Sequence, residues 1–255
     1  LRVHELGAPI DVLQLEETET PDPGPKQERI RVAAAALNIA DDLMCRGQYQ
    51  ERPSLPFTPG MELAGSVVAV GPGSSFTPGQ RVMALAVPPY GALAEESLAL
   101  DLTTYAIPDS LGDVEAAAML VTYQTAYVAL HRRAAIQRGE TLLVHAGAGG
   151  VGSAAIQQGK ATGAQVIATA GGDAKVRLCR ELGADIAIDY RNEDVGARLS
   201  ELCPDGIDVF FDNVGGEILD EALARIAQGA RSVLCGGISR YNEVEIPPGP
   251  RNYFN

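Results

Sequence analysis

Cysteine is scarce in this sequence of 255 residues, and the four that occur are widely scattered. They are Cys45, Cys179, Cys203 and Cys235. None forms a Cys-x-x-Cys pair, which argues against a zinc ribbon and against a redox-active dithiol. The simplest interpretation is a set of free, mostly buried thiols in a reducing compartment, so the cytoplasm is the expected location.

Positive charge is also in short supply. Lysine and arginine number 20 against 33 aspartates and glutamates, which gives a formal net charge of −13. Such a surface repels phosphate backbones and anionic membranes, so we expect neither a nucleic acid nor a membrane as a partner. The sequence also lacks an apolar run long enough to span a bilayer, and it shows no signal peptide.

A glycine-rich turn is the most informative feature that is present. Residues 141–152 read Thr-Leu-Leu-Val-His-Ala-Gly-Ala-Gly-Gly-Val-Gly, an apolar run followed by G-x-G-x-x-G spacing, and a helix-compatible run begins at Ser153. A strand, a glycine turn and a helix in this order are typical of dinucleotide binding. The glycines let backbone N–H groups approach a pyrophosphate at the positive end of the helix. The predicted cofactor-binding residues of this turn are Gly147, Gly149, Gly150, Val151 and Gly152.

The end of the following strand indicates which dinucleotide binds. NAD-specific folds usually place Asp or Glu about 20 residues beyond the glycine turn, where it binds the ribose 2′-hydroxyl. Here the strand ends in Thr169-Ala170-Gly171-Gly172, which are small and uncharged, with Lys175 in the next turn and Tyr190-Arg191 after the third strand. A cation and a phenol around small residues suit a 2′-phosphate. We therefore predict NADPH, bound by Ala170, Gly171, Lys175 and Tyr190.

A competing interpretation assigns NAD as the cofactor. Asp173 would then be the acid that binds the ribose, and Lys175 would be a solvated charge on a helix.

The chain changes character near residue 110. Before it, short strands are expected at 29–37, 63–70 and 81–86, separated by proline-rich loops. After it, an Ala-rich helical stretch is followed by strands that alternate with helices, which predicts a doubly wound parallel sheet. These elements are helical 113–133, strands 141–145, 165–170, 185–189, 207–211 and 231–235, and helices 150–162, 173–182 and 216–227. The prediction is an α/β protein with a β-rich domain over 1–110 and a dinucleotide-binding domain over 111–255.

Several phrases resemble the zinc-independent branch of the medium-chain dehydrogenase/reductase superfamily. Residues 1 to about 190 resemble quinone oxidoreductases in Asn38-x-x-Asp41, in Gly47-Gln-Tyr49, in Leu55 to Gly65, in Gly79-Gln-Arg-Val82 and in His145 to Gly152. The stretches 204–216, 235–242 and 249–252 are more similar to the prostaglandin and alkenal reductase group. The resemblance implies a GroES-like catalytic domain joined to a Rossmann domain, and usually a homodimer. Members of the family continue for several tens of residues past the position of Asn255, so a fold truncated at the C-terminus is expected.

The resemblance also bears on metal binding. Zinc enzymes of the superfamily ligate the catalytic ion with a Cys and a His, and the corresponding positions look like Asn38 and Met61. An amide and a thioether cannot replace a thiolate and an imidazole at a zinc site. The three histidines, His4, His131 and His145, have no Cys, Asp or Glu at ligand spacing. We therefore predict that no metal is bound.

The remaining site residues come from the resemblance. It implies that Asn38, Asp41, Tyr49 and Thr122 lie near the nicotinamide, although Tyr49 could be a packing residue and Thr122 a helix cap. Asn213 and Val214 follow the fourth strand, where doubly wound folds bind their ligand. Gly236 and Tyr241, with Asn242, match a segment that lines cofactor or substrate in the reductase group, or they form a polar loop.

The absence of a metal narrows the chemistry. The cofactor must supply the hydride, and the acceptor that needs least help is a C=C bond conjugated to a carbonyl. One or two hydrogen-bond donors such as Tyr49 or Asn38 can stabilise the resulting enolate, and a hydroxyl or water can deliver the proton. The sequence thus predicts an NADPH-dependent reductase of small quinones, enones or enals. The alternative is a non-catalytic nucleotide-binding protein with a structural or regulatory role.

Overall fold

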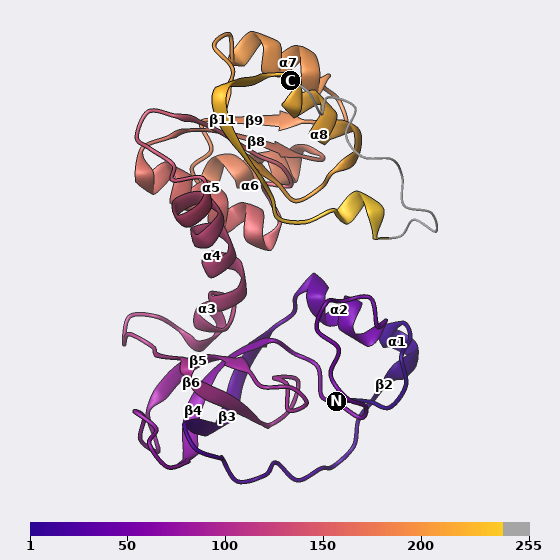
Figure 1. The fold of residues 1–255 in the computed structure, drawn as a ribbon, viewed down its shortest axis with the longest axis vertical. Helices are drawn as coiled ribbons and strands as arrows, with labels where there is room; N and C mark the ends of the chain where they lie inside the picture. Colours follow the sequence, from indigo (N-terminus) through magenta and orange to yellow (C-terminus); the bar gives the residue numbers. More distant parts are fainter. Residues whose placement is uncertain (242–255) are drawn as a thin grey trace. The chain divides into compact units, whose positions relative to one another are not determined.

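The computed structural model describes residues 1–241, apart from the side chain of Arg240. It divides into two compact units, Leu1–Val121 and a second unit that begins at Thr122. Each unit has its own sheet and its own hydrophobic core (Figure 1).

A closed antiparallel barrel forms the centre of the first unit. Its strands are β3 (Gln27–Ala36), β4 (Glu62–Val70), β5 (Arg81–Ala86) and β6 (Glu96–Ala106). β3 pairs with both β4 and β6, and β5 pairs with the same two strands, so the described sheet has no unpaired edge. Alternate side chains such as Ile30, Leu63 and Val82 fill the barrel and are fully buried. The three strands expected at 29–37, 63–70 and 81–86 are present, and β6 is an addition.

Short elements complete the first unit. They are β1 (Arg2–Val3), α1 (Pro9–Val12), β2 (Leu13–Gln14), α2 (Ile39–Cys45) and α3 (Asp113–Ala117). A second apolar cluster packs Val3, Met44 and Phe57 beneath α2, with Tyr49 and Met61 partly buried against it. α2 begins where the carboxylate of Asp41 turns back and accepts the N–H of Asn38 at 2.8 Å.

The second unit contains a five-stranded parallel sheet, which confirms the predicted doubly wound arrangement. The strands are β7 (Thr141–Val144), β8 (Gln165–Ala170), β9 (Ile186–Asp189), β10 (Ile207–Asp212) and β11 (Ile226–Leu234), in the order β11-β10-β7-β8-β9. The chain winds outward from β7 to β9 and then returns to the other side of β7. The strand order therefore reverses between β7 and β10, which is where such sheets bind ligands.

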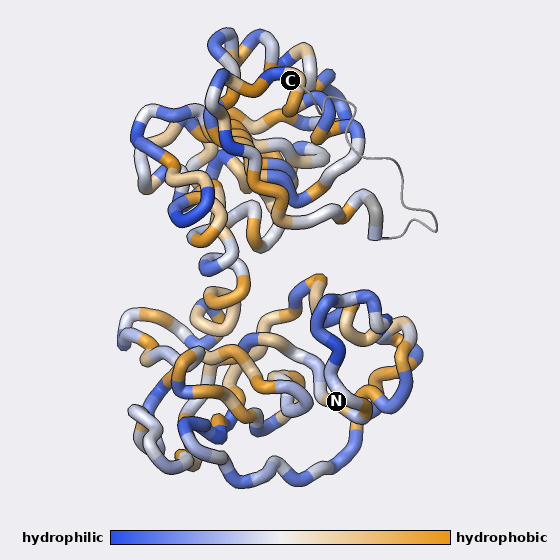
Figure 2. The backbone as a smooth tube through the Cα atoms, in the orientation of Figure 1, coloured by the Kyte–Doolittle hydropathy of each residue, from blue (hydrophilic) through white to orange (hydrophobic). Residues whose placement is uncertain are grey.

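Helices cover both faces of this sheet. α4 (Leu120–Tyr127), the π-helical turn η1 (Val128–Arg133), α5 (Gly150–Thr162) and α6 (Asp173–Glu181) belong to one side, and α7 (Val195–Leu202) and α8 (Gly216–Leu223) belong to the other. Leu142 and Val144 pack into the first core and Leu143 into the second. Because both faces are covered, the central strands β7 and β8 are largely apolar (Figure 2), whereas the edge strand β11 mixes polar and apolar residues.

The helical stretch expected over 113–133 is interrupted after Ala117, and two boundaries near the end of the described chain differ from the prediction by four residues or more. The helix expected over 216–227 ends at Leu223, and the strand expected over 231–235 begins at Ile226. β11 begins this early because it pairs with β10: Ile207 donates its N–H to Arg225 O at 2.9 Å and is the register partner of Ile226. Pairing with a neighbouring strand overrides the helical preference of this Ala-rich segment. α7 was not predicted, although Asp194 caps it by accepting the N–H of Ala197 at 2.9 Å.

Candidate functional site

The glycine turn lies between β7 and α5, as the sequence indicates. Gly147 donates its N–H to Thr169 O at 2.9 Å, and Gly149 donates to Ala146 O at 2.9 Å, so the turn folds back against β8. A Cβ on Gly152 would lie 2.2 Å from Ala146 O, which is too close for any side chain. Gly149 is the N-cap of α5 and has no side chain to satisfy the first N–H groups of the helix. The turn thus presents backbone donors at the positive end of a helix.

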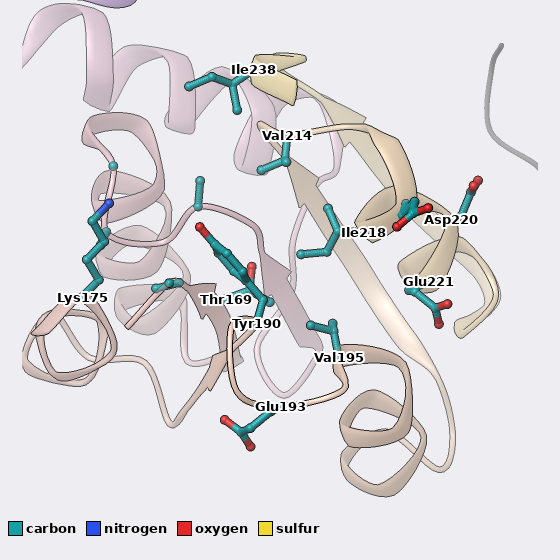
Figure 3. Close-up of a pocket in the computed structure, with 16 residues that line it drawn as sticks. Thr169, Lys175, Tyr190, Glu193, Val195, Val214, Ile218, Asp220, Glu221 and Ile238 are labelled. Carbon is teal, nitrogen blue, oxygen red and sulfur yellow. The ribbon is translucent and has the colours of Figure 1, made fainter. Parts of the chain in front are cut away.

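A cavity of about 980 Å³ lies at the carboxyl ends of the strands in the second unit (Figure 3). Six of the predicted cofactor residues line it: Gly149, Ala170, Gly171, Lys175, Tyr190 and Val214. Residues that sequence reasoning missed also line it, and they include Glu193, Val195, Glu217, Ile218 and Ile238. Their residue types have nothing in common, so only their position could have indicated them: they follow the carboxyl ends of β9, β10 and β11. The other predicted cofactor residues do not line this cavity, namely Gly147, Gly150, Val151, Gly152, Asn213, Gly236 and Tyr241.

The end of β8 shapes one wall of the cavity. A Cβ on Gly171 would lie 2.6 Å from the Tyr190 hydroxyl and 3.0 Å from Arg191 Nε, so the missing side chain lets Tyr190 close over the strand end. Figure 3 shows Tyr190 beside Thr169, with the side chain of Lys175 on the neighbouring helix. Asp173 is the first residue of α6 and does not line the cavity. The wall therefore combines a phenol, a cation and small residues, the combination predicted for a 2′-phosphate.

Asp189 holds the loop that carries Tyr190. Its carboxylate accepts the N–H of Gly172 at 2.8 Å and the N–H of Arg191 at 3.1 Å, and these hydrogen bonds lower the pKa of Asp189. These backbone N–H groups therefore stabilise Asp189 as an anion.

Asp212 likewise holds the loop that follows β10. It is fully buried, and its carboxylate accepts the N–H groups of Val214 and Gly215 at 2.9 to 3.1 Å. Asn213 O accepts the N–H of Ile238 at 3.2 Å, and a Cβ on Gly236 would lie 3.2 Å from the same oxygen. The loops after β10 and β11 are thereby joined, which brings Gly236 and Tyr241 beside Asn213. Asn242 and the segment 249–252 lie outside the described residues.

His145 fixes the base of the cavity without lining it. It is fully buried, and its ring nitrogens lie 3.0 Å from Thr169 Oγ1 and 3.1 Å from Ile218 O. Burial lowers the pKa of His145 to about 4, so the ring is neutral near pH 7. His145 therefore ties β7 to β8 and α8 as a structural residue.

Thr122 lies beside the glycine turn within the second unit. Its methyl carbon is 3.0 Å from the position that a Cβ on Gly150 would take. The structure therefore brings together two residues that are 28 positions apart in the sequence.

Asn38 and Asp41 are joined in the first unit, where buried carboxylates hold the chain, whereas Tyr49 packs against the apolar cluster beneath α2. The two oxygens of Asp41, a residue only 5% exposed, accept the N–H groups of Asn38 at 2.8 Å and Gly60 at 3.0 Å. Asn38 Nδ2 donates to Glu62 Oε1 at 2.9 Å, and Glu62 is fully buried. Burial raises the pKa of both Asp41 and Glu62. With its oxygens engaged by the backbone, Asp41 acts here as a clamp on the loop.

A small cavity of about 130 Å³ adjoins this clamp. Its lining is mostly apolar and includes Met44, Phe57, Met61 and Leu85, and it also includes Gly60. Met61 packs against the apolar cluster beneath α2. Within residues 1–241, no three His, Cys, Asp or Glu side chains gather as a metal site would require. In the same range no helix is both long enough and apolar enough to cross a lipid bilayer.

Two known domain families match the chain. The alcohol dehydrogenase GroES-like domain matches residues 24–136, and the zinc-binding dehydrogenase family matches residues 150–252.

Curated relatives extend the match to most of the chain. Quinone oxidoreductase-like protein 2 of Bos taurus is 41% identical over 86% of this chain and 64% of its own length. The quinone oxidoreductase of Lama guanicoe is 36% identical over 97% of this chain and 74% of its own length. This chain thus spans about two thirds of the length of such relatives.

Solved structures agree with these relatives. The Escherichia coli quinone oxidoreductase complexed with NADPH is 32% identical with a TM-score of 0.84, and the match covers 93% of this chain and 73% of that one. A mycobacterial protein complexed with NADPH is 34% identical with a TM-score of 0.84, covering 98% of this chain and 74% of that one.

Proposed function

Because the chain belongs to the quinone oxidoreductase type of the medium-chain dehydrogenase/reductase superfamily, we propose that it is an NADPH-dependent oxidoreductase. The proposed reaction reduces a quinone, or a C=C bond conjugated to a carbonyl. The observation that carries the proposal is the cavity in the second unit, where the glycine turn and the uncharged end of β8 meet Lys175 and Tyr190.

The cavity fits the dinucleotide in size and chemistry. Gly149 at the N-cap of α5 leaves room for a pyrophosphate, and the first N–H groups of that helix would bind it. Lys175 and Tyr190 of the cavity would hold the 2′-phosphate of the adenosine ribose. Thr122, which lies beside Gly150 of the glycine turn, would border the nicotinamide. When bound, NADPH supplies the hydride. The chain's own residues orient it and stabilise charge.

The first unit would provide the groups that act on the acceptor. The amide of Asn38 and the hydroxyl of Tyr49 are donors that could stabilise the oxygen on which negative charge develops. The apolar cavity beside Met61 and Phe57 suits one edge of a small planar acceptor. A hydroxyl or water would then deliver the proton that completes the reduction. The same residues disfavour alcohol oxidation, since Asn38 and Met61 offer no zinc ligands. The related enzymes also lead us to expect a homodimer.

The decisive experiment compares two reactions of one preparation. NADPH with 1,4-benzoquinone or a simple enone should be oxidised, which is followed at the nicotinamide absorbance band, while NADP⁺ with ethanol should not react. Efficient ethanol turnover without quinone or enone turnover would overturn the proposal. NADPH binding without any turnover would favour the non-catalytic alternative.

A further inference from the structure

Glu62 is a buried carboxylate that the proposed chemistry has not yet used. It is fully buried at the start of β4, next to Met61. Its Oε1 accepts the Asn38 side-chain N–H at 2.9 Å, and its Oε2 accepts the backbone N–H of Val121 at 2.8 Å. Both oxygens therefore have a donor from a different part of the first unit.

The second of these hydrogen bonds explains how a carboxylate can be buried here. Val121 lies in the first turn of α4, where backbone N–H groups have no partner within the helix and the helix end is partly positive. An anion at this position gains a hydrogen bond and a favourable field, which offset part of its desolvation. The nearest charge that opposes it is Asp41, whose own oxygens are engaged by Asn38 and Gly60.

The first hydrogen bond restricts the amide of Asn38. A carboxylate only accepts hydrogen bonds, so the Asn38 side chain must turn its NH₂ group toward Glu62. Without Glu62, only the capping box of α2, in which the Asn38 side chain accepts from the Asp41 backbone, would select between the two amide orientations. When one N–H bond of Nδ2 points to Glu62, the second N–H bond points in a fixed direction within the amide plane.

We infer that Glu62 is a positioning residue, which fixes the Asn38 amide so that its second N–H can donate to the acceptor oxygen. The inference rests on the proposed reduction, because only there does the direction of this N–H matter. Glu62 itself touches neither cofactor nor acceptor. It acts only by orienting Asn38, so its effect on turnover should disappear when Asn38 is absent, which a double-mutant cycle can test.

The kinetic experiment compares Asn38→Ala, Glu62→Gln and the double variant. Asn38→Ala should lower kcat for quinone reduction about 10- to 100-fold, as expected for a lost donor near a developing oxyanion. Glu62→Gln should lower kcat about 10-fold, because Gln can donate as well as accept and no longer selects one amide orientation. In the Asn38→Ala background, Glu62→Gln should change kcat less than about twofold. Multiplication of the two effects in the double variant would overturn the inference.

A matched control separates positioning from folding. Glu28 is also fully buried in the first unit, where it accepts from Ser74 Oγ at 2.6 Å and from Thr104 Oγ1 at 3.2 Å. Glu28→Gln should lower the melting temperature without lowering kcat. The equilibrium Kd for NADPH should stay within about twofold in every variant, since the lining residues of the large cavity all lie in the second unit. A fall in kcat for Glu28→Gln equal to that for Glu62→Gln would refute a specific role.

A third measurement does not depend on turnover. The Nδ2 protons of Asn38, assigned by their loss in Asn38→Ala, should exchange slowly in the NMR spectrum of the unmodified protein and faster in Glu62→Gln. Rapid exchange in the unmodified protein would show that Glu62 does not hold the amide. If the unmodified protein reduces no acceptor, the proposed function fails, and amide exchange still decides whether Glu62 orients Asn38.

Discussion

The second unit borders its cavity with a glycine turn whose donors are backbone groups, whereas the first unit arranges side chains around buried carboxylates. At the glycine turn, the donors are main-chain N–H groups, and the critical positions are those where a Cβ cannot fit. In the first unit, Asp41 holds its neighbour Asn38 and the distant Gly60, and Glu62 holds Asn38 from 24 positions away. A cavity bordered by such a turn is sensitive to added volume, and a region held by carboxylates is sensitive to lost charge or lost hydrogen bonds. The following substitutions test that contrast.

The largest effect is expected from Gly152→Ala. The new Cβ would lie 2.2 Å from Ala146 O, so the turn must shift and the pyrophosphate site is lost with it. We expect a stability cost of about 1–3 kcal/mol or more and a loss of NADPH affinity on the order of 100-fold. Titration calorimetry and thermal unfolding measure the two effects.

Gly65→Ala in β4 is the control for this substitution. Its Cβ would lie 2.0 Å from Arg31 O, so the steric conflict is similar but falls in the first unit. The folded fraction of this variant should bind NADPH with unchanged Kd. Equal loss of affinity in both variants would mean that the two units are not distinct in the way described.

Mild acid should destabilise the second unit more than the first. The pKa of His145 in the second unit is lowered to about 4 by burial, so its contribution is complete above pH 6.5 and is lost as the pH falls from 6.5 towards 4. At about 1.4 kcal/mol for each pH unit, the loss is at most about 3 kcal/mol. In the first unit, burial raises the pKa values of Glu28, Asp41 and Glu62, so folding favours their protonation and acid removes no stability through these three groups.

Hydrogen exchange at pH 7 and pH 5, corrected for intrinsic rates, measures this difference. Peptides from the second unit should lose protection first, and His145→Asn should reduce the pH dependence. Earlier loss of protection in the first unit would contradict the assignment.

Lys175→Ala should affect cofactor choice alone. Removal of one charge-assisted hydrogen bond to the 2′-phosphate should weaken NADPH binding by about 10- to 100-fold and leave NADH binding nearly unchanged. Asp173→Asn is the control, because NAD specificity through Asp173 would make that variant lose NADH affinity instead. Equal affinity of the unmodified protein for NADPH and NADH would rule out the proposed 2′-phosphate site.

Tyr49→Phe should act on turnover and not on the nucleotide. If the hydroxyl donates to the acceptor oxygen, kcat/KM for a quinone should fall by about 10-fold or less, because water can replace one donor. The Kd for NADPH should not change. An unchanged kcat/KM would assign Tyr49 to the apolar cluster beneath α2, against which it packs.

No effect at all is expected from removing metal. Asn38 and Met61 offer neither a thiolate nor an imidazole, so EDTA should leave activity and melting temperature unchanged. Elemental analysis that finds one zinc per chain would contradict this prediction.

The contrast also explains what could be predicted from the sequence. Glycine spacing is local, so the turn at 147–152, the helix α5 and the uncharged end of β8 follow from adjacent residues. The partners in the first unit are not local. Asn38 and Glu62 are 24 positions apart, and Glu62 and Val121 are 59 positions apart, so no sequence pattern joins them. Likewise, β11 began earlier than expected because its pairing with β10 outweighed local helical preference.

The close approach of Tyr190 to Gly171 has a consequence for how cofactor preference could change during evolution. An acid that binds the ribose of NAD would have to enter at the end of β8, and a side chain at Gly171 would meet the Tyr190 hydroxyl at 2.6 Å. Gly171→Asp alone should therefore be deleterious, whereas it becomes tolerable once Tyr190 has been replaced by a smaller residue. The order of the two substitutions is then constrained, because the loss of Tyr190 must precede the gain of the acid.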